Sequence, residues 1–211
     1  MEARRLTWSL AVLLLASLSC NIVPADAPAG RGLPTGLEES ERLLLARVSE
    51  AKYTGVVAFL AGLPTGLNAG RREALARAVI QESVRSGLAV ELVLGVILVE
   101  SSGNTLAVSS AGAIGLMQLR PSTAEAVAAE IGLPWTGPAL LFDPVANVQL
   151  GVAYLKRLMA RYGDVETALA AYNWGPARIA ARLRRGEALP VEYASRVLVA
   201  ADSSALRAQR I

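Results

Sequence analysis

The sequence contains no histidine, only one cysteine (Cys20) and only two lysines among its 211 residues. Without histidine, a Ser-His-Asp or Cys-His catalytic group and a zinc site with histidine ligands are excluded. A single cysteine excludes an internal disulfide, a CxxC redox pair and a thiolate metal cluster. Any proton transfer by this chain would therefore rest on carboxylates, tyrosines or water.

Charged and aromatic residues are also scarce, at 18% and 5%, whereas 53% of the residues are hydrophobic. This composition argues against disorder, and the length suffices for one substantial core. The formal charge of +3 lies almost entirely on arginine, which is compatible with an anionic polymer as partner. No arginine cluster is interleaved with aromatic residues along the chain, so we expect no nucleic-acid partner. A solvated helix face explains the arginines of one basic stretch better than binding to an anionic polymer does: Arg178, Arg182, Arg184 and Arg185.

Residues 1–25 have the pattern of a secretory leader, with two arginines near the start and a short apolar region, Leu10–Leu18. This region is short for a membrane-spanning helix, which needs about 20 apolar residues. Cys20 follows Ser-Leu-Ser, which resembles a bacterial lipoprotein cleavage box with Ser where Leu usually stands. The alternative is ordinary cleavage slightly later, after Ala25. In both cases we expect the mature protein to leave the cytoplasm, with Cys20 as a lipid anchor in the first case.

The segment that follows contains an internal repeat. Residues 26–37 are rich in Pro, Gly and Ala and are predicted to be a linker, and its Gly32–Leu37 sequence recurs as Gly62–Leu67. Each copy opens a predicted helix, over residues 38–60 and 69–86, with Asn68 as the N-cap of the second. Two copies are too few for a solenoid. We interpret residues 38–87 as a pair of helices before the main domain, with no chemistry of their own.

Residues 88–205 form the predicted main domain, and no segment of it shows the alternation of apolar and polar residues that is typical of a strand. Asp143 and Asp164 are predicted N-caps, the first with a proline at the following position. The predicted helices span residues 88–100, 121–131, 144–162, 165–172, 177–185 and 193–207, with a turn at 173–176. The fold class is therefore all-α.

A carboxylate ends a long apolar run of the predicted main domain. The run Leu88–Val99 leads directly into Glu100, and on a helix Glu100 shares a face with Val93, Val96 and Ile97. Burial there disfavours the ionised form and would raise the pKa, as a general acid requires. Position alone leaves open the alternative that Glu100 points outward and only solvates the end of the helix.

Two later segments combine residue types suited to ligand contact. In Gly115-Leu116-Met117-Gln118, the glycine permits close approach of the backbone, and Gln118 offers both a donor and an acceptor. Residues 171–176 place a phenol, an amide and an indole at a helix end, a composition suited to sugar or peptide contacts. Taken singly, these segments also fit an ordinary turn and a capped helix.

Together with Glu100-Ser101, residues 109–118, 147–154 and 170–173 resemble the soluble lytic transglycosylase family. These are bacterial cell-wall enzymes with a goose-type-lysozyme-like helical domain. The resemblance covers about residues 88–199. It implies a lysozyme-like helical domain preceded by a short helical N-terminal region, with peptidoglycan glycan strands as partner. It also implies the periplasm or cell envelope as location, at the outer membrane if Cys20 carries lipid.

The resemblance assigns roles residue by residue. Glu100 matches the single catalytic acid/base. Ser109, Gln118 and Tyr172 match residues near the substrate. The remaining matches are supporting residues: Ser101 after the acid, Met117 in the glycine-rich turn, Asn173 beside the tyrosine, and Glu192 in a late motif.

Two positions depart from the family pattern. Tyr193 follows Glu192 at once, so the late motif is shortened and the role of Glu192 is in doubt. Arg120 stands where the family frequently has a methionine that touches the substrate.

The carboxylates limit the mechanism. An ordinary glycosidase uses two carboxyl groups, about 5 Å apart for retention or about 6.5–9.5 Å apart for inversion. Near the motifs only Glu100 qualifies, because Asp143 and Asp164 are better explained as caps. One carboxyl suffices if the substrate's N-acetyl group attacks the anomeric carbon. In the family, the acid then removes a proton from the C6 hydroxyl of N-acetylmuramic acid and a 1,6-anhydro ring closes, without metal or cofactor.

Two other functions stay open at this stage. A lysozyme-like hydrolase on the same fold would leave reducing ends in place of anhydro ends. A non-catalytic peptidoglycan-binding or scaffold protein would keep the fold without turnover.

Overall fold

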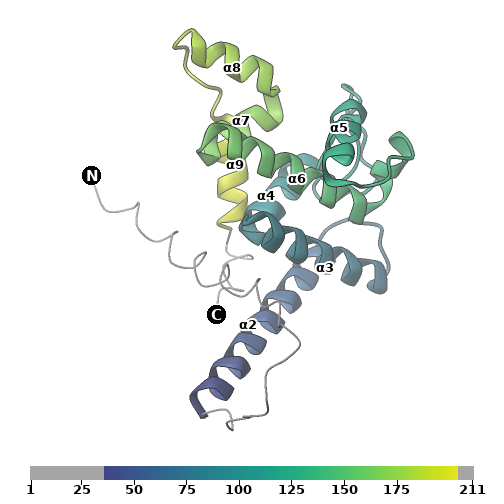
Figure 1. Ribbon diagram of the computed structural model, residues 1–211. Helices are drawn as coiled ribbons and strands as arrows, with labels where there is room; N and C mark the ends of the chain where they lie inside the picture. The colour runs from purple at the N-terminus through teal and green to yellow at the C-terminus, as the bar shows by residue number, and fades with distance from the viewer. Residues whose placement is uncertain (1–35, 204–211) are drawn as a thin grey trace, which may run out of the picture. The chain divides into compact units, whose positions relative to one another are not determined.

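The computed structural model describes residues 36–203, and within them every regular element is a helix (Figure 1). In chain order the elements are α2 (Gly36–Ala61), α3 (Ala69–Ser86), α4 (Val90–Ser101), α5 (Pro121–Ile131), the short 3-10 helix η1 (Pro138–Phe142), α6 (Pro144–Tyr162), α7 (Val165–Trp174), α8 (Pro176–Arg184) and α9 (Glu192–Ala201). The only extended pairings in this range are isolated bridges at Ile114, so the all-α prediction is confirmed. No helix in the described range combines the length and hydrophobicity of a membrane span. The predicted leader, Cys20 and nearly all of the predicted linker lie outside the described residues.

The predicted helix starts are confirmed where the capping residue is described. The side chains of Asn68, Asp143 and Asp164 each accept a hydrogen bond from the backbone N–H three residues further on, at 2.9, 2.8 and 2.7 Å. Each such cap satisfies a donor that the first helical turn leaves unpaired. The two aspartates are thus fully explained as caps.

Two predicted boundaries were wrong, and one short helix was missed. The segment 173–176 is not a turn, because α7 continues through Trp174 and the N–H of Gly175 still reaches the carbonyl of Ala171 at 3.0 Å. The last helix ends at Ala201, before a short polar Asp-Ser pair whose side chains compete with helical hydrogen bonding. The 3-10 helix η1 was not predicted at all.

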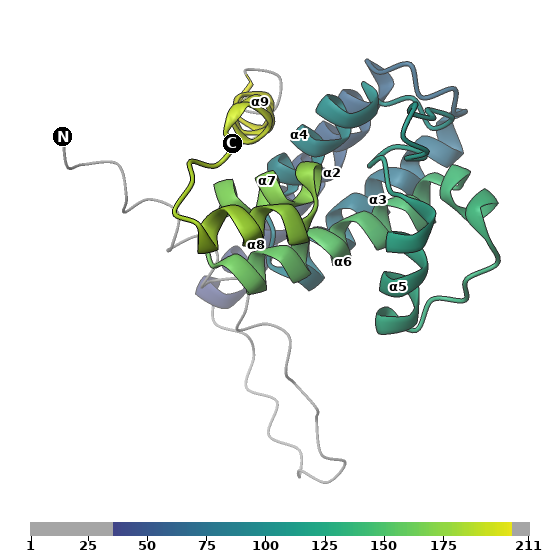
Figure 2. The same ribbon diagram turned by 90° about the horizontal axis from the view of Figure 1, so that it is seen from above.

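The core is built around α6. This helix packs against α3, α5, α7 and η1, and Figure 2 shows α3 and α7 beside it. Its completely buried residues include Val148, Leu150 and Leu155. By clustering of contacts the chain divides into residues 1–47 and 48–211, and the whole core lies in the second unit.

The helix that ends at Glu100 packs closely against the last helix. Gly95 of α4 faces α9, where a Cβ atom would lie 2.7 Å from the carbonyl oxygen of Val197 and 3.0 Å from the amide nitrogen of Ala201. A larger residue at position 95 would therefore push the two backbones apart. In this way a glycine of α4 sets where α9 lies.

The second copy of the repeat has a structural role. Thr105, shortly after Glu100, donates its hydroxyl to the carbonyl of Thr65 at 3.0 Å, and both threonines are buried. The α-carbon of Gly103 approaches Leu63 so closely that a Cβ would lie 2.7 Å from the leucine Cβ. The segment between α2 and α3 thus supports the turn that follows Glu100.

Candidate active site

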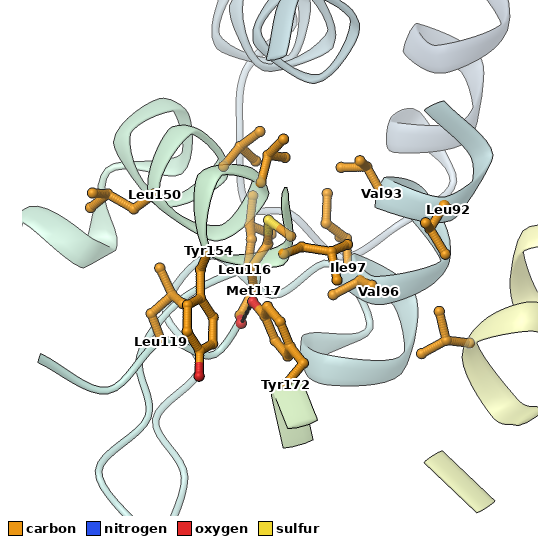
Figure 3. Close-up of a cluster of buried hydrophobic side chains, with 14 of the residues drawn as sticks. Leu92, Val93, Val96, Ile97, Leu116, Met117, Leu119, Leu150, Tyr154 and Tyr172 are labelled. Atoms are coloured by element: carbon orange, nitrogen blue, oxygen red, sulfur yellow. Dashed lines mark hydrogen bonds between the residues drawn. The ribbon is translucent and has the colours of Figure 1, made fainter. Parts of the chain in front are cut away.

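Glu100 lies in the last turn of α4, on the face that the sequence predicted. Val93, Val96 and Ile97 on that face are completely buried (Figure 3). The glutamate itself is half-buried, and burial is the main cause that raises the pKa of its carboxyl group above the ordinary value. The prediction of a raised pKa is confirmed.

Tyr193 on α9 is the direct partner of this carboxyl group. Its hydroxyl donates to Oε1 of Glu100 at 2.6 Å, and the tyrosine is 3% exposed. This hydrogen bond, followed by the charge of Arg196 one turn later on α9, lowers the pKa of Glu100 against the effect of burial. No carboxylate in the described part of the chain is among the groups that shift this pKa. Besides burial, the described groups that shift the pKa of Glu100 are therefore one phenol and one guanidinium.

The turn after the acid is held by Ser101. The Ser101 hydroxyl donates to the carbonyl of Ile97 at 3.1 Å and accepts from the N–H of Gly103 at 3.1 Å. Ser102 has φ 52°, a left-handed conformation that ends the helix. These bonds fix the backbone immediately behind Glu100.

Asn147 of α6 fixes the glycine-rich turn. It is completely buried, accepts from the N–H of Met117 at 2.8 Å, and donates to the carbonyls of Ile114 and Leu141 at 3.0 and 2.9 Å. Gly115, with φ 79°, leaves room for this amide where a side chain would overlap it. One amide thus ties the turn to α6 and η1.

Gln118 is the polar residue of the same turn. It has φ 47°, and its Nε2 donates to the carbonyls of Ala107 and Gly115 at 3.1 and 2.9 Å. Both amide hydrogens are therefore used inside the loop, and Oε1 is the atom that can accept from a ligand.

Tyr172 of α7 binds this turn to α7. Its hydroxyl donates to the carbonyl of Met117 at 2.8 Å, and its ring lies 5.2 Å from that of Tyr154 (Figure 3). Burial, followed by the charge of Glu100, raises the pKa of Tyr172 well above its ordinary value. Burial, followed by the charges of Glu100 and Tyr172, also raises the pKa of Tyr193 well above its ordinary value. The two phenols and the carboxyl group therefore lie within electrostatic reach of one another.

The other predicted site residues lie differently. The Ser109 hydroxyl accepts from the N–H of Ala113 at 3.0 Å and so closes its own loop. Met117 is completely buried and packs against Gly151. Asn173 and Glu192 are exposed, and it is Tyr193, one residue after Glu192, that reaches the acid.

Sequence reasoning missed three residues of this arrangement, Asn147, Tyr193 and Arg196. Asn147 and Tyr193 were noted only as parts of motif segments, because their partners are 30 and 93 residues away. A polar residue in the apolar stripe of α6 was the available signal for Asn147.

A separate hollow of about 260 Å³ lies between α3, α6 and the end of α5, and its lining includes Glu82, Arg85 and Lys156 but not Glu100.

In the range that the structure describes, no three His, Cys, Asp or Glu side chains are grouped so that they could hold a metal ion.

Comparison with known proteins identifies the family. Residues 77–192, more than half of the chain, match the transglycosylase SLT domain family. The chain belongs to this family. The resemblance found in the sequence is thereby confirmed, and the SLT domain match includes Glu100, the glycine-rich turn and Tyr172.

Two relatives and one solved structure are similar to this SLT domain protein. It is 43% identical over 93 residues to the transglycosylase of Enterobacteria phage PRD1, covering 44% of this chain and 32% of the relative. It is 45% identical over 87 residues to a putative soluble lytic murein transglycosylase of Haemophilus influenzae, covering 41% of this chain and 15% of the relative. It is similar to the lytic transglycosylase Slt of Pseudomonas aeruginosa, solved as an inactive glutamate-to-glutamine variant. There the TM-score is 0.50 at 27% identity, covering 63% of this chain and 22% of the other. The chain thus spans a third or less of the length of each.

Proposed function

We propose that this protein is a peptidoglycan lytic transglycosylase that cleaves the β-1,4 bond between N-acetylmuramic acid and N-acetylglucosamine. The observation that carries the proposal is the single half-buried carboxyl group of Glu100, with its raised pKa and its hydrogen bond from Tyr193. Membership in the SLT domain family supports it. So does the inactivity of the Pseudomonas aeruginosa enzyme after one glutamate-to-glutamine change.

In the proposed reaction Glu100 acts first as acid and then as base. Its proton passes to the glycosidic oxygen as the C1–O bond breaks, while the carbonyl oxygen of the N-acetyl group bonds to C1. The Glu100 carboxylate then takes the proton of the C6 hydroxyl, whose oxygen attacks C1 and displaces the acetamido oxygen. The acid is protonated again at the end, and no water is consumed.

The neighbours of Glu100 suit both steps. Burial keeps the carboxyl group protonated closer to neutral pH, as the first step needs, and Tyr193 stabilises the carboxylate that the second step uses. Ser109, Gln118 and Tyr172 are proposed to contact or border the substrate, and Ser101, Met117 and Asn173 to support the loops around it. Glu192 lies exposed at the start of α9, so a supporting role for it would have to run through Tyr193.

The location follows from the substrate. Peptidoglycan lies in the bacterial cell envelope, and the leader and the cysteine at position 20 are consistent with export. We propose a periplasmic protein that is anchored at the outer membrane if Cys20 is lipidated. Mass spectrometry of the mature N-terminus would decide between lipidation and ordinary cleavage.

Product analysis tests the activity. Purified peptidoglycan is digested with the wild type and with Glu100→Gln, and the muropeptides are weighed by mass spectrometry. We expect 1,6-anhydro ends with the wild type and a loss of turnover of about 10²–10⁴-fold with the variant. Reducing ends would support the hydrolase instead, and unchanged turnover in the variant would remove Glu100 from the mechanism.

The same variant needs a test of folding. Folding raises the pKa of Glu100, so its carboxylate is less stable in the folded protein than in the unfolded chain, and the free energy of unfolding falls once the pH rises above the unfolded-state value. A glutamine does not ionise and avoids this loss. Chemical unfolding at pH 7 should therefore show Glu100→Gln at least as stable as the wild type. A large loss of stability would mean that Glu100 is structural, as in the scaffold hypothesis.

A further inference from the structure

Arginine side chains lie over aromatic rings on three neighbouring helices. The guanidinium carbon of Arg157 lies 5.0 Å from the centre of the Tyr154 ring, and that of Arg161 lies 5.4 Å from Tyr162. At the end of α7 the arrangement recurs, with Arg178 of α8 5.2 Å from the Trp174 ring. Each contact holds a cation over the face of an aromatic ring.

These pairs adjoin one another. The hydroxyl of Tyr162 donates to the carbonyl of Pro176 at 2.9 Å, which joins the end of α6 to the start of α8. The pKa of Tyr154 is raised mainly by burial. The charges of Arg157 and Arg161 lower this pKa and that of Tyr162 raises it, so these four groups lie within electrostatic reach of one another. We call this set the arginine–aromatic surface: Tyr154, Arg157, Arg161, Tyr162, Trp174 and Arg178.

The arginine–aromatic surface begins beside the proposed catalytic acid. The ring of Tyr154 packs against that of Tyr172 (Figure 3). After burial, the charge of Glu100 is the next cause that raises the pKa of Tyr172. The buried pair Tyr154 and Tyr172 therefore joins this surface to the surroundings of Glu100.

The charges of the arginine–aromatic surface are only partly neutralised. Arg157 is paired with Glu130. Arg161 and Arg178 are exposed, and neither has an ion-pair partner within residues 36–203. Trp174 is 45% exposed although it is a large apolar side chain. Arg178 beside the open indole of Trp174, and Arg161 over the neighbouring Tyr162 ring, are suited to a carboxylate-bearing ligand with an apolar body.

We propose that the arginine–aromatic surface binds the carboxylates of the acidic peptides that branch from the peptidoglycan strand held at Glu100. This inference rests on the proposed function. In an intact strand the lactyl carboxyl of N-acetylmuramic acid is amide-linked to the peptide, so the free carboxylates belong to the peptide. Arg161 and Arg178 pair with them, and the indole of Trp174 covers the peptide's apolar part.

Binding to catalytically inactive protein tests this inference separately from activity. In the Glu100→Gln background, dissociation constants are measured at low salt for three soluble probes: glycan strands that carry peptides, strands stripped of them by an amidase, and uncharged chitohexaose. Arg161→Gln with Arg178→Gln should weaken binding of the peptide-bearing strand by about tenfold or more, the equivalent of one lost charge-assisted hydrogen bond. Binding of chitohexaose should not change.

Arg184→Gln is the matched control. Arg184 lies on α8, is exposed, and has neither an aromatic nor an ion-pair partner among the described residues. It should leave all three dissociation constants unchanged. An equal loss of affinity with Arg184→Gln would mean that only net charge matters. If Arg161→Gln with Arg178→Gln weakened binding of the stripped strands as much as that of the peptide-bearing strands, the site would be assigned to the lactyl carboxyl. Either result overturns the proposal. If the wild type gave no anhydro products but the binding pattern held, the proposed function would fail and the peptide site would stand.

Discussion

Glu100 experiences opposing influences on its pKa. Burial against the apolar face of α4 favours the neutral acid, while the Tyr193 hydroxyl and the Arg196 charge favour the carboxylate. A group that must give up a proton and then accept one needs both influences, since a pKa far from the working pH would impede one of the two steps. The balance at Glu100 is thus a property of α4 and α9 together.

Replacement of the phenol tests that balance. Tyr193→Phe removes a hydrogen bond that stabilises the carboxylate, so the pKa of Glu100 should rise further. Because the first step needs the protonated acid, the alkaline limb of the pH profile of kcat/KM should move to higher pH. Its maximum should fall by about tenfold, the effect of roughly one hydrogen bond to a charged group. Rates of peptidoglycan solubilisation across pH measure both effects.

Tyr53→Phe on α2 is the control for this experiment, because Tyr53 packs with Arg77 and is absent from the groups that shift the pKa of Glu100. An alkaline limb of Tyr193→Phe that stays in place, or moves to lower pH, would contradict the assignment of Tyr193 as the partner of the acid.

Residue-scale prediction from the sequence succeeded where the cause was local. The face of Glu100 followed from helical periodicity, and the caps at Asp143 and Asp164 followed from their positions before apolar helices. Tyr193 and Asn147 could not be derived in that way, because their roles depend on which helices pack together. Four residues of the arginine–aromatic surface stand close together within residues 154–162, but their junction with Trp174 and Arg178 depends on how α6, α7 and α8 pack.

At the scale of helices, the site depends on how closely α4 and α9 approach. α4 carries the acid and α9 carries its phenol, and Gly95 permits the contact between them. The sequence predicted a helix ending at the acid, yet gave no reason for a glycine in its apolar interior. The reason is the carbonyl of Val197, which occupies the space of a side chain.

A methyl group at position 95 should therefore disturb the site from a distance. Gly95→Ala gains about 1 kcal/mol of helix propensity but overlaps backbone atoms of α9, which cannot rotate away as a side chain could. We expect a net loss of about 1–3 kcal/mol in the free energy of unfolding, measured by urea titration. The alkaline limb should shift in the same direction as in Tyr193→Phe, because the phenol moves away from Glu100.

Gly70→Ala is the matched control, since Gly70 lies in the exposed first turn of α3 with only the Asn68 side chain near its Cβ position, at 3.9 Å. It should be neutral or slightly stabilising. Equal stability of the two alanine variants would contradict a close α4–α9 contact.

At the scale of the whole molecule, the domain organisation predicted from the sequence places a boundary between residues 87 and 88. The family match begins earlier, at residue 77, and α3 packs against both α6 and α4. Leu60 at the end of α2 is also completely buried in the common core. We therefore expect the folding unit of this protein to include the second half of α2 and all of α3.

Two fragments distinguish these boundaries. A fragment of residues 88–211 lacks four large side chains that are at most 1% exposed in the core: Val56, Leu60, Leu75 and Val79. Each contributes about 1.5–3 kcal/mol when buried, so the sum of about 6–12 kcal/mol is comparable to the whole stability of a typical domain, about 5–15 kcal/mol. Circular dichroism during thermal unfolding should show no cooperative transition for residues 88–211 and a cooperative one for residues 48–211. Cooperative unfolding of the shorter fragment would restore the boundary at residue 88 and leave α3 as an accessory. Loss of the transition in both fragments would instead extend the folding unit into residues 1–47, because the cut at residue 48 divides α2.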